Sequence, residues 1–251
     1  MIRYVSRAMT QRAARRASYP PRRSRPARHA TPCGPTPICC VVALLRCIVA
    51  TRTLDVGGLE IVALFLAGGL RSHGFDTIVA HAALARSGER PADSLRFDGV
   101  PVVKLSERDV QQSLKTHRPD VISMHAPPDW LVAAAAEARI PTIETLHGAH
   151  SLFDREAWPR ERLRSQQITG FVAVSELVRR QYLRANHGYP PDRIITIPNG
   201  IDNQHISHRD RTQARAWLGL RNEFLFVSLA RYALQKNTLG LVTAFSDVAR
   251  E

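Results

Sequence analysis

The most informative absence in this sequence is that of acidic residues from its first fifth. Residues 1–54 contain 11 arginines and no Asp or Glu, and the whole chain of 251 residues has a formal net charge of +13. Residues 55–251 hold 24 basic and 22 acidic residues, so the rest of the chain is nearly neutral. A basic binding face would spread its cations over the folded part, so this charge does not indicate a nucleic-acid-binding domain.

The Arg-, Pro- and Ser-rich composition of residues 1–38 predicts a disordered arm. The same composition is typical of a transit peptide. Its cations also predict weak, non-specific contact with an anionic membrane or a nucleic acid. The alternative is an extension without a role, since no periodic pattern accompanies the arginines.

Residues 48–251 contain no cysteine. The four cysteines of the chain are Cys33, Cys39, Cys40 and Cys47. Their spacing matches no zinc-binding pattern, so no metal site is predicted, and nothing indicates a disulfide framework. We therefore expect a reducing, cytoplasmic location, with peripheral membrane contact through the basic arm as an addition.

Long hydrophobic runs are also missing. The apolar run 38–50 is interrupted by Arg46 and is shorter than the roughly 20 residues that a membrane-spanning helix needs. No transmembrane segment is predicted. A buried strand explains this run better than a signal sequence does, because alternating apolar and amphipathic segments follow it.

What the sequence does contain is a regular alternation of short apolar runs and amphipathic segments, which predicts an α/β, Rossmann-like, doubly wound parallel sheet. The predicted strands are 41–51, 76–82, 100–105, 120–126, 141–147, 170–175 and 193–198. The predicted helices are 59–73, where Gly68 and Gly69 interrupt the helical spacing, and 107–117, 130–139, 155–167 and 175–186. The polar segment 82–99 is predicted to be a long surface loop.

The composition changes after residue 205, which predicts a second, incomplete lobe. We expect one complete domain over 39–205, a linker over 206–222 that contains a short helix, and an isolated βα unit over 223–251. In that unit 223–229 is the predicted strand, and a helix begins at about Thr238.

Ligands of open α/β sheets bind beyond the carboxyl ends of the strands, so the residues that follow each strand are the candidates. Gly57 and Gly58 lie between the first strand and the first helix, where a backbone without side chains lets an anion approach a helix N-terminus. The segment is not a G-x-G-x-x-G fingerprint, and a tight turn is the alternative.

Histidines follow two further strands. His147 comes directly after a predicted strand, His150 stands three residues later, and His125 ends the strand before. A histidine there can orient or polarise a substrate hydroxyl, and a change of charge near pH 7 would suit that role. Gly148 and the lack of a third ligand argue against a metal, and a histidine bonded only to the backbone is the alternative.

Two later segments complete the set of candidates. Asn199, Gly200 and Asp202 follow the seventh strand, where they fit either a chain reversal or a hinge between two lobes. Arg231 and Lys236 lie beside the predicted start of the last helix, where two cations could grip a phosphate. A solvated surface pair is the alternative for these cations.

Taken in order, these segments resemble glycosyltransferase family 4, whose members have the two-lobed GT-B fold. GGLE, TLHG, AVSE and IPNGID are similar to family segments, and ARYALQK keeps the R-x4-K spacing of the family's phosphate loop. In that loop Ala230 and Asn237 replace glycines, and the family's later E-x7-E segment has no counterpart. The resemblance covers about residues 41–251 and implies a donor lobe that is truncated.

The resemblance implies retaining transfer of a sugar from a nucleotide diphosphate donor to an acceptor hydroxyl, without a metal or other cofactor. Arg231 and Lys236 would neutralise the donor diphosphate, and His147 would contact the transferred sugar. Gly57 and Gly58 would allow close approach in the cleft. The alternatives are a non-catalytic module that binds an acceptor or polyanion, and another two-lobed nucleotide-sugar enzyme such as an epimerase.

Overall fold

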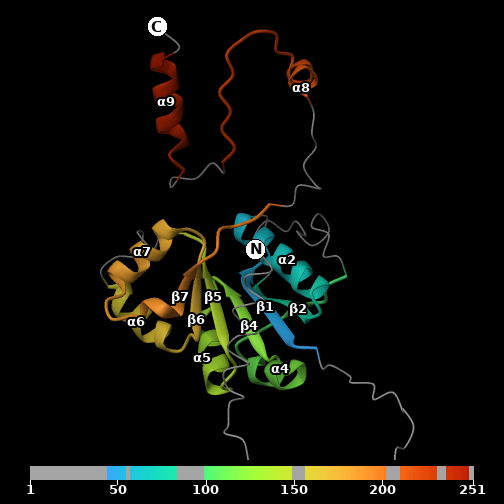
Figure 1. Ribbon diagram of the computed structural model, residues 1–251, viewed down its shortest axis with the longest axis vertical. Helices are drawn as coiled ribbons and strands as arrows, with labels where there is room; N and C mark the ends of the chain where they lie inside the picture. The colour runs from blue at the N-terminus through green and yellow to red at the C-terminus, as the bar shows by residue number, and fades with distance from the viewer. Residues whose placement is uncertain are drawn as a thin grey trace, which may run out of the picture. The chain divides into compact units, whose positions relative to one another are not determined.

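A computed structural model describes most of the chain beyond its basic arm (Figure 1). The described residues are 44–54, 57–83, 99–148, 156–201, 210–230 and 236–248. The chain divides into two compact units between residues 201 and 202, and each unit is described by itself. The predicted arm 1–38, most of the loop 82–99, and His150, Asp202 and Arg231 lie outside the described residues.

Unit 1 is built on a seven-stranded sheet in which every neighbouring pair of strands is parallel. The strands are β1 (Arg46–Thr53), β2 (Asp76–Ala83), β3 (Val102–Lys104), β4 (Val121–His125), β5 (Thr142–Leu146), β6 (Gly170–Ala173) and β7 (Ile194–Thr196). Their order is β3-β2-β1-β4-β5-β6-β7, so the direction of winding reverses between β1 and β4. The predicted Rossmann-like sheet is confirmed.

The helices that connect these strands also match the predicted segments. They are α2 (Gly58–Ser72), α4 (Val110–His117), α5 (Asp129–Glu137), α6 (Ala157–Gln166) and α7 (Glu176–Ala185), with a 3-10 turn at Pro191–Arg193. The predicted helix 59–73 is confirmed as α2, which continues through Gly68 and Gly69 to Ser72. Burial of Ala67 and Leu70 on either side of the two glycines offsets their low helix propensity. None of the helices in the described ranges is both long and apolar enough to cross a membrane.

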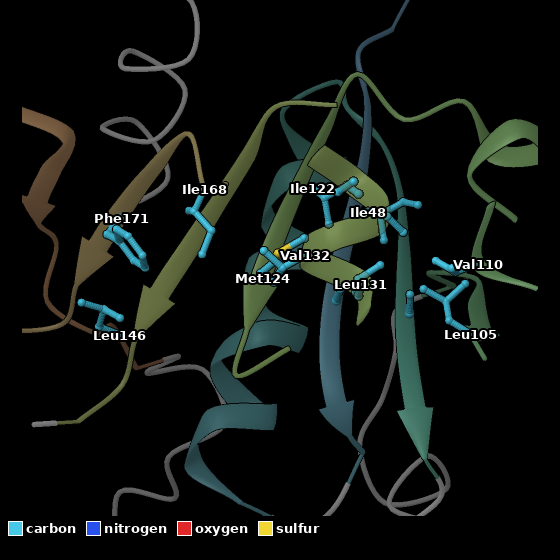
Figure 2. Packing of buried hydrophobic residues seen from close by; sticks show 14 of the residues in the cluster. Ile48, Leu105, Val110, Ile122, Met124, Leu131, Val132, Leu146, Ile168 and Phe171 are labelled. Atoms are coloured by element: carbon cyan, nitrogen blue, oxygen red, sulfur yellow. The ribbon is translucent and has the colours of Figure 1, made fainter. Parts of the chain in front are cut away.

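Alternate residues of β1, β2 and β4 face two separate hydrophobic cores. Ile48 and Ala50 of β1 pack in the larger core with side chains of α4, α5 and α7, part of which is shown in Figure 2. Cys47 and Val49, which alternate with Ile48 and Ala50 along β1, pack in the smaller core with side chains of α2. Because successive strand residues point to opposite faces, α2 covers one face of the sheet, and α4, α5 and α7 cover the other.

A buried charge network attaches α6 to the sheet. Arg164 of α6 donates to Glu144 of β5 at 2.7 Å, and its guanidinium also lies 3.1 Å from a carboxylate oxygen of Asp129 and 3.3 Å from one of Glu161. Tyr182 of α7 donates to Glu161 at 2.8 Å. Helix α6 has few apolar residues of its own, so these polar contacts hold it in register with the sheet.

Unit 2 contains helices α8 (Arg211–Trp217) and α9 (Thr238–Val248). Asp210 caps α8 by accepting a hydrogen bond from the backbone N–H of Gln213 at 2.8 Å. The prediction of a strand over 223–229 is wrong, since these residues form no strand. A strand is defined by hydrogen bonds to a neighbour, and the described residues of this unit contain no neighbouring strand. None of those described residues is buried.

Candidate functional site

The candidate site lies at the carboxyl edge of the unit 1 sheet, where β1 and β4 are adjacent and the winding direction reverses. Thr51 of β1 pairs in register with His81 of β2 on one side and with His125 of β4 on the other. His125 pairs in turn with Thr145 of β5. Residues in register on parallel strands point to the same face, so these four side chains lie on the face that α2 covers. All four are buried, which makes this a polar edge under a helix.

Two histidines from neighbouring strands meet at this edge. Nδ1 of His125 lies 2.8 Å from Nε2 of His147, and the ring centroids are 5.0 Å apart with an interplanar angle of 38°. Oγ of Ser123 lies 3.3 Å from the other nitrogen of His125, Nε2. His125 is fully buried at 1% exposure, while His147, directly after β5, is partly exposed. The chain Ser123–His125–His147 therefore leads from the interior to the surface of the edge.

Burial keeps both imidazoles neutral. It lowers the pKa of His125 from 6.5 to about 3, with a further contribution from the neighbouring His147. Burial likewise lowers the pKa of His147 to about 4. The expectation that His147 changes charge near pH 7 is therefore wrong, because removal from water disfavours the imidazolium. At neutral pH His147 can donate or accept a hydrogen bond, but it brings no positive charge.

The two predicted glycines begin helix α2, and their surroundings differ. Gly57 is the residue before the helix, with extended backbone at φ −153°, and its carbonyl accepts from the N–H of Ile61 at 3.1 Å. A Cβ on Gly57 would lie 2.4 Å from Oε2 of Glu60, whose other carboxylate oxygen accepts from Thr53 at 3.4 Å. A Cβ on Gly58 would meet nothing within 4 Å. Gly57 thus makes room for the Glu60 carboxylate, whereas the space beside Gly58 is open.

Three side chains of this edge escaped sequence reasoning. Glu60 stands inside the GGLE segment, and an acidic residue in the first turn of a predicted helix is the signal that could have identified it. Ser123 stands two residues before His125, on the same face of β4. Arg52 donates to the carbonyl of Pro127 at 3.3 Å and so ties the end of β1 to the loop after β4, a contact that no local pattern predicts.

The remaining predicted residues of the described ranges lie in two separate units. Asn199 and Gly200 form an exposed loop after β7 in unit 1. Lys236 is exposed and belongs to unit 2, just before α9. Within the described ranges, no three His, Cys, Asp or Glu side chains are grouped as a metal ion would require. The structure therefore joins His125 and His147, and leaves the hinge and phosphate roles as predictions.

Comparison with known sequences gives one family match. The sequence model described as Glycosyltransferase Family 4 matches residues 56–205, which is more than half of the chain and includes Gly57, Gly58, His125 and His147 of the candidate edge. No curated protein matches significantly.

Comparison with solved structures supports the same fold. A glycosyltransferase from Rickettsia africae matches with a TM-score of 0.62 at 16% identity, over 83% of this chain and 59% of that one. The Anabaena protein HepE in complex with UDP matches with a TM-score of 0.57 at 18% identity, over 70% of this chain and 50% of that one. HepE with UDP and glucose matches with a TM-score of 0.58 at 19% identity, over 76% and 56%. The chain thus spans little more than half the length of the structures it matches.

Proposed function

Since the chain belongs to glycosyltransferase family 4, we propose that unit 1 is the acceptor-binding lobe of an enzyme that transfers a sugar from a nucleotide diphosphate donor to an acceptor hydroxyl with retention. The observation that carries this proposal is the neutral pair His125 and His147, at the edge where the sheet reverses its winding. Ligands of open α/β sheets bind at such a reversal.

The proposed reaction breaks the bond between the anomeric carbon and the donor diphosphate. The acceptor hydroxyl forms the new glycosidic bond and gives its proton to an oxygen of the departing diphosphate, and the nucleoside diphosphate leaves with the bonding electron pair. Because its imidazole is neutral, His147 can form a hydrogen bond with the transferred sugar and does not compete with the diphosphate-binding cations for the anionic leaving group.

The donor is proposed to be a UDP-sugar, because the matching HepE structures contain UDP, and UDP with glucose. Arg231 and Lys236 are proposed to neutralise the diphosphate, since a guanidinium and an ammonium can stabilise the charge that develops as the bond breaks. The open space beside Gly58 at the start of α2 is proposed to admit the substrate. The residues Asn199, Gly200 and Asp202 are proposed as the hinge between this lobe and the donor lobe.

The test is binding and turnover by the full chain with UDP-glucose, GDP-mannose and ADP-glucose. Calorimetry measures binding, and release of free nucleotide with and without a panel of hydroxyl acceptors measures turnover. His147→Ala should abolish turnover but leave nucleotide binding within about twofold, whereas Lys236→Ala should weaken nucleotide binding. His187→Ala, at an exposed histidine of the same unit, is the matched control and should change neither.

The results separate catalysis from simple binding. Turnover whose product keeps the anomeric configuration of the donor, read by NMR, would support retention, and inversion would contradict it. Binding of an acceptor without any turnover would support a binding module instead. If the full chain binds no nucleotide sugar, the proposal of a transferase that acts as this chain fails.

A further inference from the structure

The inference concerns the proton between the two histidines at the carboxyl edge. Nitrogen atoms 2.8 Å apart must share one proton, because two facing lone pairs would repel and two facing N–H groups would collide. Each neutral imidazole carries a single N–H. The protonation of Nδ1 in His125 and of Nε2 in His147 is therefore linked, so that one ring donates and the other accepts.

Two arrangements satisfy this requirement. In the first, the Ser123 hydroxyl donates to Nε2 of His125, Nδ1–H of His125 donates to Nε2 of His147, and His147 carries its own proton on Nδ1. In the second, every bond is reversed, and Nδ1 of His147 is left as a lone pair. The two arrangements present opposite groups to a ligand, a hydrogen-bond donor in the first and an acceptor in the second.

The buried hydroxyl of Ser123 discriminates between them. Among the described residues its only side-chain partner is His125, and Ser123 is only 4% exposed. The first arrangement uses the hydroxyl proton in a hydrogen bond, whereas the second leaves it buried without an acceptor, which is unfavourable. The neighbouring hydroxyl of Thr51 donates to the carbonyl of Thr53 at 2.7 Å, so it does not compete for the pair.

We propose that His125 is a positioning residue that, together with Ser123, fixes His147 as the Nδ1–H tautomer, so that His147 presents a hydrogen-bond donor at the edge of the sheet. Nδ1 of His147 has no hydrogen-bond partner among the described residues, and the ring is partly exposed, so this donor is available to a ligand. The group it fits is an acceptor oxygen, such as a hydroxyl oxygen of the transferred sugar. Only the identity of that ligand rests on the proposed function.

The tautomer can be measured without a substrate. Long-range 1H–15N correlation spectra of the full, 15N-labelled chain at pH 7 distinguish protonated from unprotonated ring nitrogens, and His125→Asn and His147→Gln identify the two sets of signals by their loss. We expect His147 to have a protonated Nδ1 and an unprotonated Nε2, and His125 to have a protonated Nδ1. Protonation of His147 at Nε2, or averaging of its two nitrogens, would overturn the proposal.

Substitutions of His125 separate positioning from packing. An Asn amide places an N–H near the position of Nδ1, so His125→Asn should keep His147 in the Nδ1–H form. His125→Phe fills similar space without a donor and should release His147 to the Nε2–H form or a mixture, as should Ser123→Ala. Circular dichroism identifies variants that are unfolded, and the exposed His187→Gln is the control that should change neither histidine. An unchanged His147 in folded His125→Phe would show that His125 does not position it.

A functional readout distinguishes the two proposals. If the full chain turns over UDP-glucose, the rate should fall at least tenfold in His125→Phe and recover partly in His125→Asn, with nucleotide binding unchanged. If the spectra show the expected tautomer but no nucleotide sugar binds, the proposed function fails and the assignment of His125 stands. If turnover is found and His147 carries its proton on Nε2, the proposed function stands and the assignment of His125 as a positioning residue fails.

Discussion

Arg164 and Glu144 form an ion pair at 2.7 Å under helix α6, with side chains exposed by only 14% and 7%. The guanidinium is shared with Asp129 and Glu161, so one cation serves three carboxylates. A charge removed from water is tolerated only when its partner is present. Arg164 is therefore the cation that compensates the buried carboxylates of Glu144 and Glu161 between α6 and the sheet.

Replacement of this arginine should be strongly destabilising. Arg164→Met leaves buried carboxylates without a cation, and we expect the free energy of unfolding to fall by about 3–5 kcal/mol, measured by urea denaturation. The control is Arg160→Met, because Arg160 also contacts Asp129 but is 80% exposed, and we expect a loss below about 1 kcal/mol. Similar losses in the two variants would contradict the assignment of the network to Arg164.

The same network predicts a pH dependence. Burial raises the pKa of Glu144 from 4.5 to about 7, with Arg164 opposing and Glu161 adding to the rise. The folded state therefore holds a proton that the unfolded state loses, and this contribution to stability is complete below pH 4.5 and is lost as pH rises through 7. The free energy of unfolding of Glu144→Gln should not show this fall. Between pH 5 and 7 its slope should differ from that of the wild type by up to about 1.4 kcal/mol per pH unit. Parallel pH profiles of the wild type and Glu144→Gln would contradict the assignment of this pH dependence to Glu144.

The histidine pair predicts the opposite slope at lower pH. The pKa of His125 is lowered to about 3, so between pH 6.5 and 3 the unfolded state binds a proton that the folded state does not. Its contribution to stability is complete above pH 6.5 and is lost as pH falls toward 3. His125→Asn removes this proton uptake, so between pH 6 and 4 its stability should fall less steeply than that of the wild type, by about 1.4 kcal/mol per pH unit. Glu144 is present in both proteins and cancels from the comparison.

The two glycines before α2 should respond differently to alanine. Gly58→Ala meets no atom within 4 Å and should stabilise unit 1 by about 0.4–1 kcal/mol, because it restricts the unfolded chain. Gly57→Ala displaces the Glu60 carboxylate and breaks its bond to Thr53, so it should be about 1 kcal/mol less stable than Gly58→Ala. Thermal unfolding measures both changes. In a Glu60→Ala background the difference between the two variants should vanish, and its persistence would exclude this contact as the cause.

Unit 2 should be far less protected than unit 1. The ring of Phe226 lies 5.0 Å from that of Phe224 and 5.2 Å from that of Phe245, measured between centroids, yet each of the three is at least 45% exposed. Short helices without a buried face are marginal in water. Hydrogen exchange should therefore be near the unfolded rate in α8 and α9 and slow in β1 and β4. Comparable protection in both units would show that residues of unit 2 are buried in solution.

The alternation of apolar segments was enough to predict the sheet, because parallel strands buried on both faces require apolar runs joined by helices. It also placed Gly57, Gly58 and His147 after strands, where ligands bind. It failed at 223–229, where an apolar run looks like a strand whether or not a neighbour is present to pair with it. It held at Gly68 and Gly69, where packing of α2 on the sheet outweighs the low helix propensity of glycine.

The order of the elements and the residues at their ends follow from the sequence, since both depend on periodicity and on turn-forming residues. The folded sheet is needed to show that His125 and His147, which are 22 positions apart, lie 2.8 Å from each other, and that neither is charged at neutral pH. Strand order and register bring them together, and burial sets their pKa. The hydrogen bond and the desolvation that define the edge are properties of neighbours in space, which no local pattern of residues encodes.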